Sequence, residues 1–152
     1  MTGTGLDAMR LHSRQEFQTW LANDLEVRDE LAGLMGGDPG TGLESLDRLE
    51  AFLLRRYQHP EDALRLDQRG VLDAAARHVG LVMILGIDDA AWDINLTDED
   101  DAYYRLPVVQ IAGGPAECPL SLVTAALDRR TGDYLRTVVQ NLAEAYNEPD
   151  GS

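Results

Sequence analysis

The chain has 152 residues, with 27 acidic side chains against 13 basic ones and a formal net charge of −14. A chain of this length forms one domain, and burying about 70% of its unfolded surface gives a core that needs neither a metal nor a disulfide. The charge opposes binding to nucleic acid, whose recognition requires basic patches, and to anionic membrane surfaces. It favours solubility and would steer a basic partner towards the protein.

The sequence shows no sign of export or of membrane insertion. The first residues lack a positively charged stretch followed by an apolar one, so no signal peptide is visible. The longest apolar run, residues 79–85, is too short to span a bilayer. The single cysteine, Cys118, excludes an internal disulfide. We therefore expect a cytoplasmic protein.

Apolar residues recur at helical spacing in three segments of the N-terminal half. The first helix is predicted over residues 13–35, because Ser13 and Glu16 have the spacing of a capping box. A second helix follows, with one apolar face over residues 46–57. The third runs from about residue 67 to residue 85 and becomes apolar all round towards its end, so we expect it to be the central helix.

The C-terminal half predicts two strands followed by two helices. Residues 92–96 alternate between apolar and polar side chains, which is typical of a half-buried strand, and residues 106–111 are rich in β-branched side chains. Residues 119–127 and 131–146 return to helical spacing, and Thr131 is placed to cap the last helix.

The predicted order is therefore three helices, two strands and two helices. This is an α+β fold with about five helices around a small antiparallel sheet (order ααα-ββ-αα). Because a two-stranded sheet is marginal by itself, it must lean on the central helix, gain strands or pair with another chain. We place the domain at residues 13–147, between flexible tails at residues 1–12 and 148–152.

The most distinctive feature is an acidic segment that contains no base. Its seven acids are Asp88, Asp89, Asp93, Asp98, Glu99, Asp100 and Asp101. Clustered carboxylates suit Ca²⁺ or Mg²⁺. The spacing Asp93-x-Asn95-x-Thr97 has the start of an EF-hand loop, but Asp98 and Tyr104 stand where that loop has glycine and glutamate. Three interpretations stay open: a solvated loop, a partner-binding surface or a metal site.

Two tyrosines follow these acids directly. Tyrosines beside charged residues are enriched at protein interfaces. A partner-binding surface in this stretch would consist of its acids and tyrosines, namely Asp98, Glu99, Asp100, Asp101, Tyr103 and Tyr104. The alternative is that one of the tyrosines packs inside the protein where the second strand begins.

A reactive thiol is the second candidate site. Cys118 precedes Pro119, which fits the first position of a helix, and the dipole at a helix N-terminus lowers the pKa of a thiol. A nucleophilic cysteine needs a base, which His78 or His59 would have to supply. Neither histidine lies in a catalytic motif, and the alternative for His78 is a partly buried structural residue. The sequence has no phosphate-binding, dinucleotide-binding or nucleophile-elbow motif.

A further pattern covers residues 70–112. A helix with a step of small residues and glycine at residues 75–80 is followed by a strand tryptophan, Trp92, and by a strand that begins near Pro107. This pattern resembles that of uncharacterised small acidic proteins of high-GC bacteria. The resemblance implies no activity.

These features favour a non-enzymatic protein-interaction domain whose acidic surface binds a basic protein partner, as an immunity protein or an antitoxin would. The alternative is a small enzyme, or a ligand-binding or metal-binding domain, that uses Cys118 with a histidine or the acids of residues 88–101. A third alternative is a structural subunit that pairs its sheet across a homodimer. We expect no cofactor.

Overall fold

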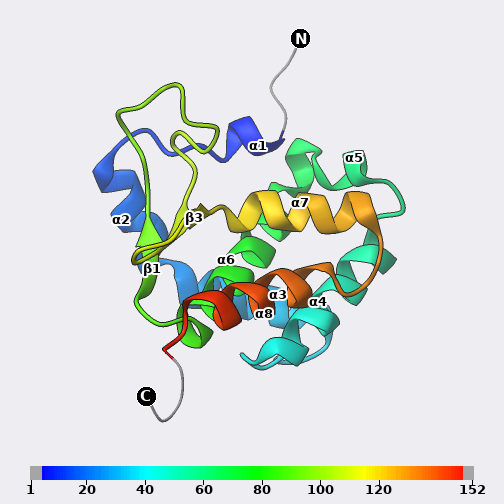
Figure 1. Cartoon of the computed structure of the whole chain (residues 1–152). Coiled ribbons are helices and arrows are strands. Elements are labelled where there is room, and N and C mark those ends of the chain that lie inside the picture. The colour runs from blue at the N-terminus through cyan, green and yellow to red at the C-terminus, as the bar shows by residue number, and fades with distance from the viewer. Residues whose placement is uncertain (1–4, 149–152) are drawn as a thin grey trace.

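Most of the described chain is helical, and a small antiparallel sheet lies beside the longest helix (Figure 1). The computed structural model describes residues 5–148. Its helices are α1 (Gly5–Ala8), α2 (Arg14–Ala22), α3 (Asp24–Met35), α4 (Leu43–Arg56), α5 (Pro60–Ala63), α6 (Arg69–Gly86), α7 (Pro119–Arg129) and α8 (Tyr134–Tyr146), with a 3₁₀ turn at Leu66–Gln68. The α+β class is confirmed. The predicted number of about five helices is wrong, because the described residues form eight α-helices.

Part of this difference comes from the first predicted helix, which is two helices in the structure. Ser13 caps α2 as predicted, since its Oγ accepts the N–H of Glu16 at 3.1 Å. The helix is interrupted at Asn23, close to the point where the Trp20 carbonyl accepts a hydrogen bond from Arg77 Nη1 at 2.7 Å. A donor from another element that enters the backbone ladder is a common cause of such breaks. The remaining extra helices, α1 and α5, have four residues each and show no helical period in the sequence.

Helix α6 is the central helix, as its apolar character predicted. Every residue from Ala74 to Gly80 is buried, and α3, α7 and α8 pack around this helix together with the sheet. Gly80 allows the closest approach. A Cβ atom at this position would lie 2.2 Å from two ring atoms of Trp92, so only glycine lets the indole lie against the helix.

The sheet has three antiparallel strands in the order β1-β2-β3, where two were predicted. They are β1 (Ala90–Asp93), β2 (Val108–Ile111) and β3 (Ala116–Glu117). Trp92 pairs with Val109 in the register of the first two strands. Pairing stops at Asp93 instead of Leu96, because Asp93 Oδ1 accepts the N–H of Ile94 and the chain turns away. β3 has only two residues, too few for a visible alternation.

The N-terminus of α8 is capped by a side chain from another helix. Thr131 was predicted to cap it, but the helix begins after Asp133, whose side chain makes no capping hydrogen bond. Instead the carboxylate of Glu50, on α4 and fully buried, accepts the N–H groups of Tyr134 at 3.2 Å and Leu135 at 2.9 Å. A carboxylate at a helix N-terminus also interacts favourably with the helix dipole, so Glu50 ties α4 to α8.

Both chain ends are attached to the fold as far as they are described. Residues 5–12, predicted as part of a flexible tail, contain α1 and place Leu6 and Met9 against the core. At the other end, Glu148 donates its N–H to Asp88 Oδ2 at 2.9 Å. The rest of the two predicted tails, residues 1–4 and 149–152, lies outside the described residues. None of the helices in residues 5–148 is long and apolar enough to cross a membrane.

Candidate functional site

The loop between β1 and β2, residues 94–107, carries all four acids predicted to bind a partner, and we call it the acidic loop. Its turn is stabilised by side chains that accept hydrogen bonds from backbone N–H groups two or three residues later. Asn95 Oδ1 accepts the N–H groups of Thr97 and Asp98, each at 3.0 Å, and Asp98 Oδ1 accepts the N–H of Asp100 at 3.0 Å. Such local bonds fix a turn without help from neighbouring elements.

The carboxylate of Asp101 is hydrogen-bonded within the loop and stabilises its turn. Its carboxylate accepts the N–H of Tyr103 at 2.9 Å and the side-chain amide of Asn95 at 2.8 Å. These two hydrogen bonds favour the charged form and lower the pKa of Asp101 below its usual value. Asp98, Glu99 and Asp100 are exposed. The outward-facing acids of the predicted surface are therefore these three.

The two tyrosines of the predicted surface have different surroundings. Tyr103 is half-buried and packs against the core, and burial raises the pKa of its hydroxyl. Tyr104 lies under the guanidinium of Arg105, 4.8 Å from the ring centroid. The sequence left open whether one tyrosine packs inside, and the structure assigns that role to Tyr103.

Residues 10–12, which we call the strap, are hydrogen-bonded to the later part of the acidic loop. Leu11 donates its N–H to the carbonyl of Arg105 at 2.8 Å, and Arg10 Nη1 donates to the carbonyl of Tyr104. The ring of His12 lies 3.0 Å from Arg105 Nη1. These residues were predicted as tail, and nothing local in the sequence links them to a loop more than ninety positions away.

The acidic segment, continuous in sequence, is divided in space by strand β1. Asp88 and Asp89 lie in the turn before the strand, where Asp88 also accepts a hydrogen bond from Glu148. Asp93 ends the strand, and the remaining acids lie in the acidic loop beyond it. Six ion pairs join side chains of the described residues, and none involves an acid of residues 88–101.

The arrangement does not favour a metal site in this segment. Within residues 5–148, no group of three or more His, Cys, Asp or Glu side chains is placed to hold a metal ion. The carboxylates of Asp98 and Asp101 are instead engaged with backbone N–H groups.

Cys118 lies at the N-cap of α7, as its position before Pro119 predicted, but it is buried, with 1% of its surface exposed. Burial raises the pKa of the thiol, opposite to the direction expected from the helix dipole. His78 is also buried, and its Nε2 lies 2.9 Å from the Oγ of Ser45. His59 is an exposed residue at the start of α5. No hydrogen bond among the described residues joins Cys118 to either histidine.

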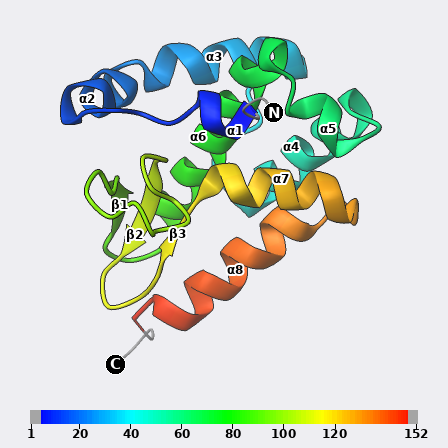
Figure 2. The same cartoon turned by 90° about the horizontal axis from the view of Figure 1, so that it is seen from above.

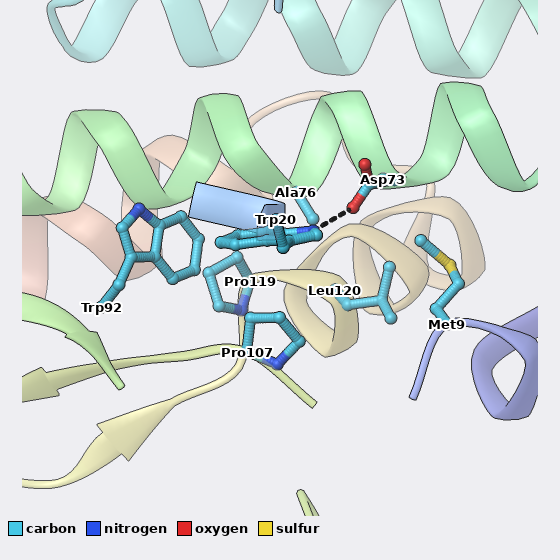
Figure 3. A pocket seen from close by; sticks show the side chains of 8 residues that line it. All are labelled: Met9, Trp20, Asp73, Ala76, Trp92, Pro107, Pro119 and Leu120. Atoms are coloured by element: carbon cyan, nitrogen blue, oxygen red, sulfur yellow. Dashed lines mark hydrogen bonds between the residues drawn. The ribbon is translucent and has the colours of Figure 1, made fainter. Parts of the chain in front are cut away.

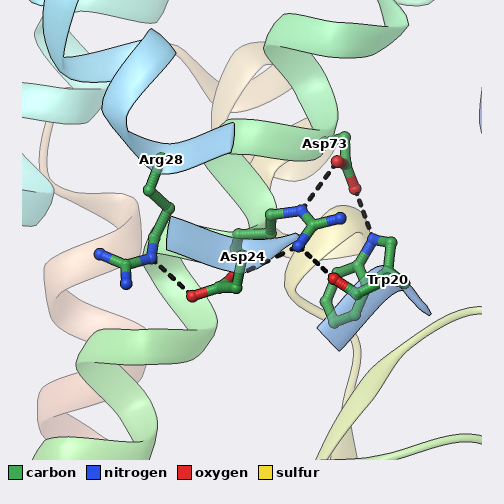
Figure 4. A network of polar contacts seen from close by, with 5 residues as sticks. Trp20, Asp24, Arg28 and Asp73 are labelled. Atoms are coloured by element: carbon green, nitrogen blue, oxygen red, sulfur yellow. Dashed lines mark hydrogen bonds and ion pairs between the residues drawn. The ribbon is translucent and has the colours of Figure 1, made fainter. Parts of the chain in front are cut away.

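Sequence reasoning missed a buried polar network centred on Arg77 (Figure 4). Arg77, 3% exposed, donates from Nε to Asp73 Oδ2 at 2.8 Å and from Nη1 to the Trp20 carbonyl. Its guanidinium lies 4.0 Å from the ring centroid of Trp20, whose indole N–H donates to Asp73 Oδ1 at 2.9 Å. Asp24 completes the network, with Oδ1 3.5 Å from Arg77 Nη1. The i, i+4 spacing of Asp73 and Arg77 was the only sequence signal available.

The same tryptophan borders an apolar pocket (Figure 3). Its walls come from the residue that follows α1, from α2, α6, β1 and α7, and from the end of the acidic loop. The lining residues are Met9, Trp20, Asp73, Ala76, Trp92, Pro107, Pro119 and Leu120. The space inside is about 10 Å³, no more than a single water needs. The pocket is therefore a packing gap between elements and does not accommodate a substrate.

No protein-family model matches this chain, and no curated protein or solved structure matches it. An argument about function therefore depends on the chemistry of the residues themselves.

Proposed function

We propose that the protein is a non-enzymatic interaction domain that binds a basic protein partner through the acidic loop. The observation that carries this proposal is the lack of ion pairs for all seven acids of residues 88–101, within the described part of a chain that has thirteen bases. Unpaired carboxylates create a negative potential that attracts and orients a cationic surface.

The shape of the loop supports the same proposal. Its turn is fixed by backbone N–H groups that donate to the side chains of Asn95 and Asp98, and the strap of residues 10–12 is hydrogen-bonded to its later part. A surface that is already ordered loses little conformational entropy when a partner binds. Tyr104, stacked on Arg105 next to the acids, supplies an aromatic group of the kind that anchors protein interfaces.

The size and charge of the chain fit an immunity or antitoxin-like protein that neutralises a basic toxin. Such a pair must form quickly and tightly, and opposite net charges accelerate association at low ionic strength. The burial of the only thiol favours binding over catalysis by Cys118.

The test compares two variants that lose the same charge at different places. The first neutralises the acidic loop with Asp98→Asn, Glu99→Gln and Asp100→Asn, and leaves Asp101 to keep the turn. The second is a control with Glu26→Gln, Asp29→Asn and Glu30→Gln on α3, where all three acids are exposed. Each variant and the wild type would be immobilised and titrated with purified basic proteins of the source organism at low and high salt.

We expect the loop variant to lose at least about tenfold in affinity and the control to lose less than about threefold. Equal losses would show that only net charge matters and would contradict a specific surface on the loop. Binding that is unchanged by both variants would contradict the proposal altogether.

A further inference from the structure

Strand β1 is an open edge of the sheet. The sheet order places it outermost, farthest from β3 and from α7, which follows β3 in the chain (Figures 1 and 2). In an antiparallel pair, alternate residues direct their backbone groups towards the neighbouring strand. Asp89 accepts the N–H of Ala112 at 3.1 Å, so Asp89, Ala91 and Asp93 face β2.

It follows that Ala90 and Trp92 direct their N–H and C=O groups away from the sheet. No hydrogen bond from the described residues reaches these outward groups. The strand is held in place from one face, because the Trp92 side chain packs on Gly80 of α6 and edge-on against Trp20. The next outward N–H, that of Ile94, is taken by Asp93 Oδ1 at 2.8 Å, so the open edge ends there.

Acids flank this edge at both ends. Asp88 and Asp89 precede the strand, Asp93 ends it, and the acidic loop follows, whereas β1 itself carries no base. A second copy of the chain is a poor occupant, because pairing two β1 strands would bring these acids together between molecules that each have a net charge of −14. A strand that carries lysine or arginine would instead find opposite charges at both ends of the edge.

We propose that β1 accepts an extended, basic segment of the partner as an added strand, bonded to the backbone of Ala90 and Trp92. In this mode the main chain supplies hydrogen bonds, and the flanking charges select the partner. The inference rests on the proposed function and deepens it, because it names the secondary structure and the charge of the partner segment. It places the contact on the strand that ends where the acidic loop begins.

The test uses the whole protein and a pair of probes. One probe is a short peptide of alternating lysine and valine. The matched control has the same sequence and charge, but alternate backbone amides are N-methylated, so it cannot pair as a strand. Binding is measured by titration, and the exchange of individual backbone amides with deuterated solvent is followed by NMR.

We expect the lysine–valine peptide to slow exchange at the amides of Ala90 and Trp92 by at least about tenfold at saturation, since each gains a hydrogen bond. The amides of Ala91 and Asp93 face β2 already and serve as internal controls that change little. The N-methylated peptide should bind at least about tenfold more weakly. Asp89→Asn with Asp93→Asn should weaken binding of the first peptide about threefold and keep the turn, because asparagine tolerates the positive φ of 54° at position 89.

Equal binding of the two peptides, or unchanged exchange at Ala90 and Trp92 in the bound state, would overturn strand addition. The proposed function would then be judged separately, by the acidic-loop variant and its α3 control. Slow exchange of these two amides without any peptide, together with a dimer in light scattering, would assign the edge to a second copy and would equally overturn the inference.

Discussion

Two groups of acidic residues in this molecule have different surroundings, which give them opposite roles. Around α6, Asp24 and Asp73 lie beside the buried guanidinium of Arg77. Between residues 88 and 101, the acids form no ion pair with any described residue and bond mainly to nearby backbone. The first region uses negative charge to hold helices together. The second presents negative charge to solvent.

The two regions meet at a pair of tryptophans. Trp20 belongs to the Arg77 network, and its ring centroid lies 4.8 Å from that of Trp92 in an edge-to-face contact. Trp92 belongs to β1, the strand that separates the two groups of unpaired acids. The buried network therefore supports the strand that positions the exposed charges. Four changes would break or sharpen this comparison.

The largest effect is expected for Arg77→Met. The change removes the cation that Asp24 and Asp73 share, so that Asp73 loses its ion pair and Asp24 keeps only its pair with Arg28. It should lower the free energy of unfolding by about 4 kcal/mol, including the lost contact with the Trp20 ring. Urea denaturation measures the difference. The control is Arg65→Gln, which breaks an exposed ion pair with Asp67 and should cost less than about 1 kcal/mol. Similar losses in the two variants would contradict the distinction between the regions.

The second effect is a loss of stability in mild acid that originates at His78. Burial lowers the pKa of His78 to about 4, against 6.5 in an unfolded chain. Between these values the unfolded state binds a proton that the folded state does not. Neutral His78 therefore makes its full contribution to the free energy of unfolding above about pH 6.5. This contribution declines as the pH falls, and the loss reaches about 3 kcal/mol near pH 4.

Chemical denaturation at several pH values between 7 and 4 measures this decline. A His78→Gln variant should lose stability less steeply over the same range, because its side chain does not titrate. An identical slope in the variant and the wild type would show that the decline comes from other groups.

The third effect concerns the contact between Gly80 of α6 and the Trp92 ring of β1. Gly80→Ala would place a Cβ 2.2 Å from the Trp92 ring, so the indole and the strand must move. We expect a loss of about 2 kcal/mol in stability and a shifted NMR signal of the Trp92 indole. Gly33→Ala is the matched control, since it lies inside α3 with nothing within 4 Å of the new Cβ, and it should stabilise by about 0.5–1 kcal/mol. An unchanged Trp92 signal in the first variant would contradict the tight packing at this step.

The smallest effect on stability is expected for the acidic-loop variant, which we expect to weaken partner binding most. Neutralising Asp98, Glu99 and Asp100 removes exposed charges without ion pairs and should change the free energy of unfolding by less than about 0.5 kcal/mol. Asn and Gln keep an oxygen acceptor, including the one at position 98 that accepts the N–H of Asp100. Thermal unfolding beside the α3 control variant measures the change. A large loss would mean that these acids stabilise the fold.

Local periodicity was enough to predict several parts of the fold. Helical spacing indicated α4, α6 and α8, and the alternation around Trp92 indicated the first strand within a few residues. The capping box at Ser13 also formed as predicted. These features depend on backbone geometry over a few residues, which a sequence displays directly. Very short elements such as α1 and β3 contain less than a full pattern and were missed.

The candidate site divides in the same way. The sequence located the acidic segment and its tyrosines, because composition is visible without a structure. It did not reveal that Asp101 fixes the turn, that Tyr103 packs inwards, or that the strap of residues 10–12 holds the loop. It also placed Cys118 at a helix start but missed the burial that raises its pKa.

What the sequence by itself determined, then, is the α+β class, the central helix and the place of the acidic charge along the chain. Only the tertiary structure decided which acids are paired. Asp73 meets Trp20 across 53 positions, and Glu50 reaches Leu135 across 85. Charge pairing depends on distances of a few ångströms between side chains, and packing sets those distances between elements that the sequence leaves far apart.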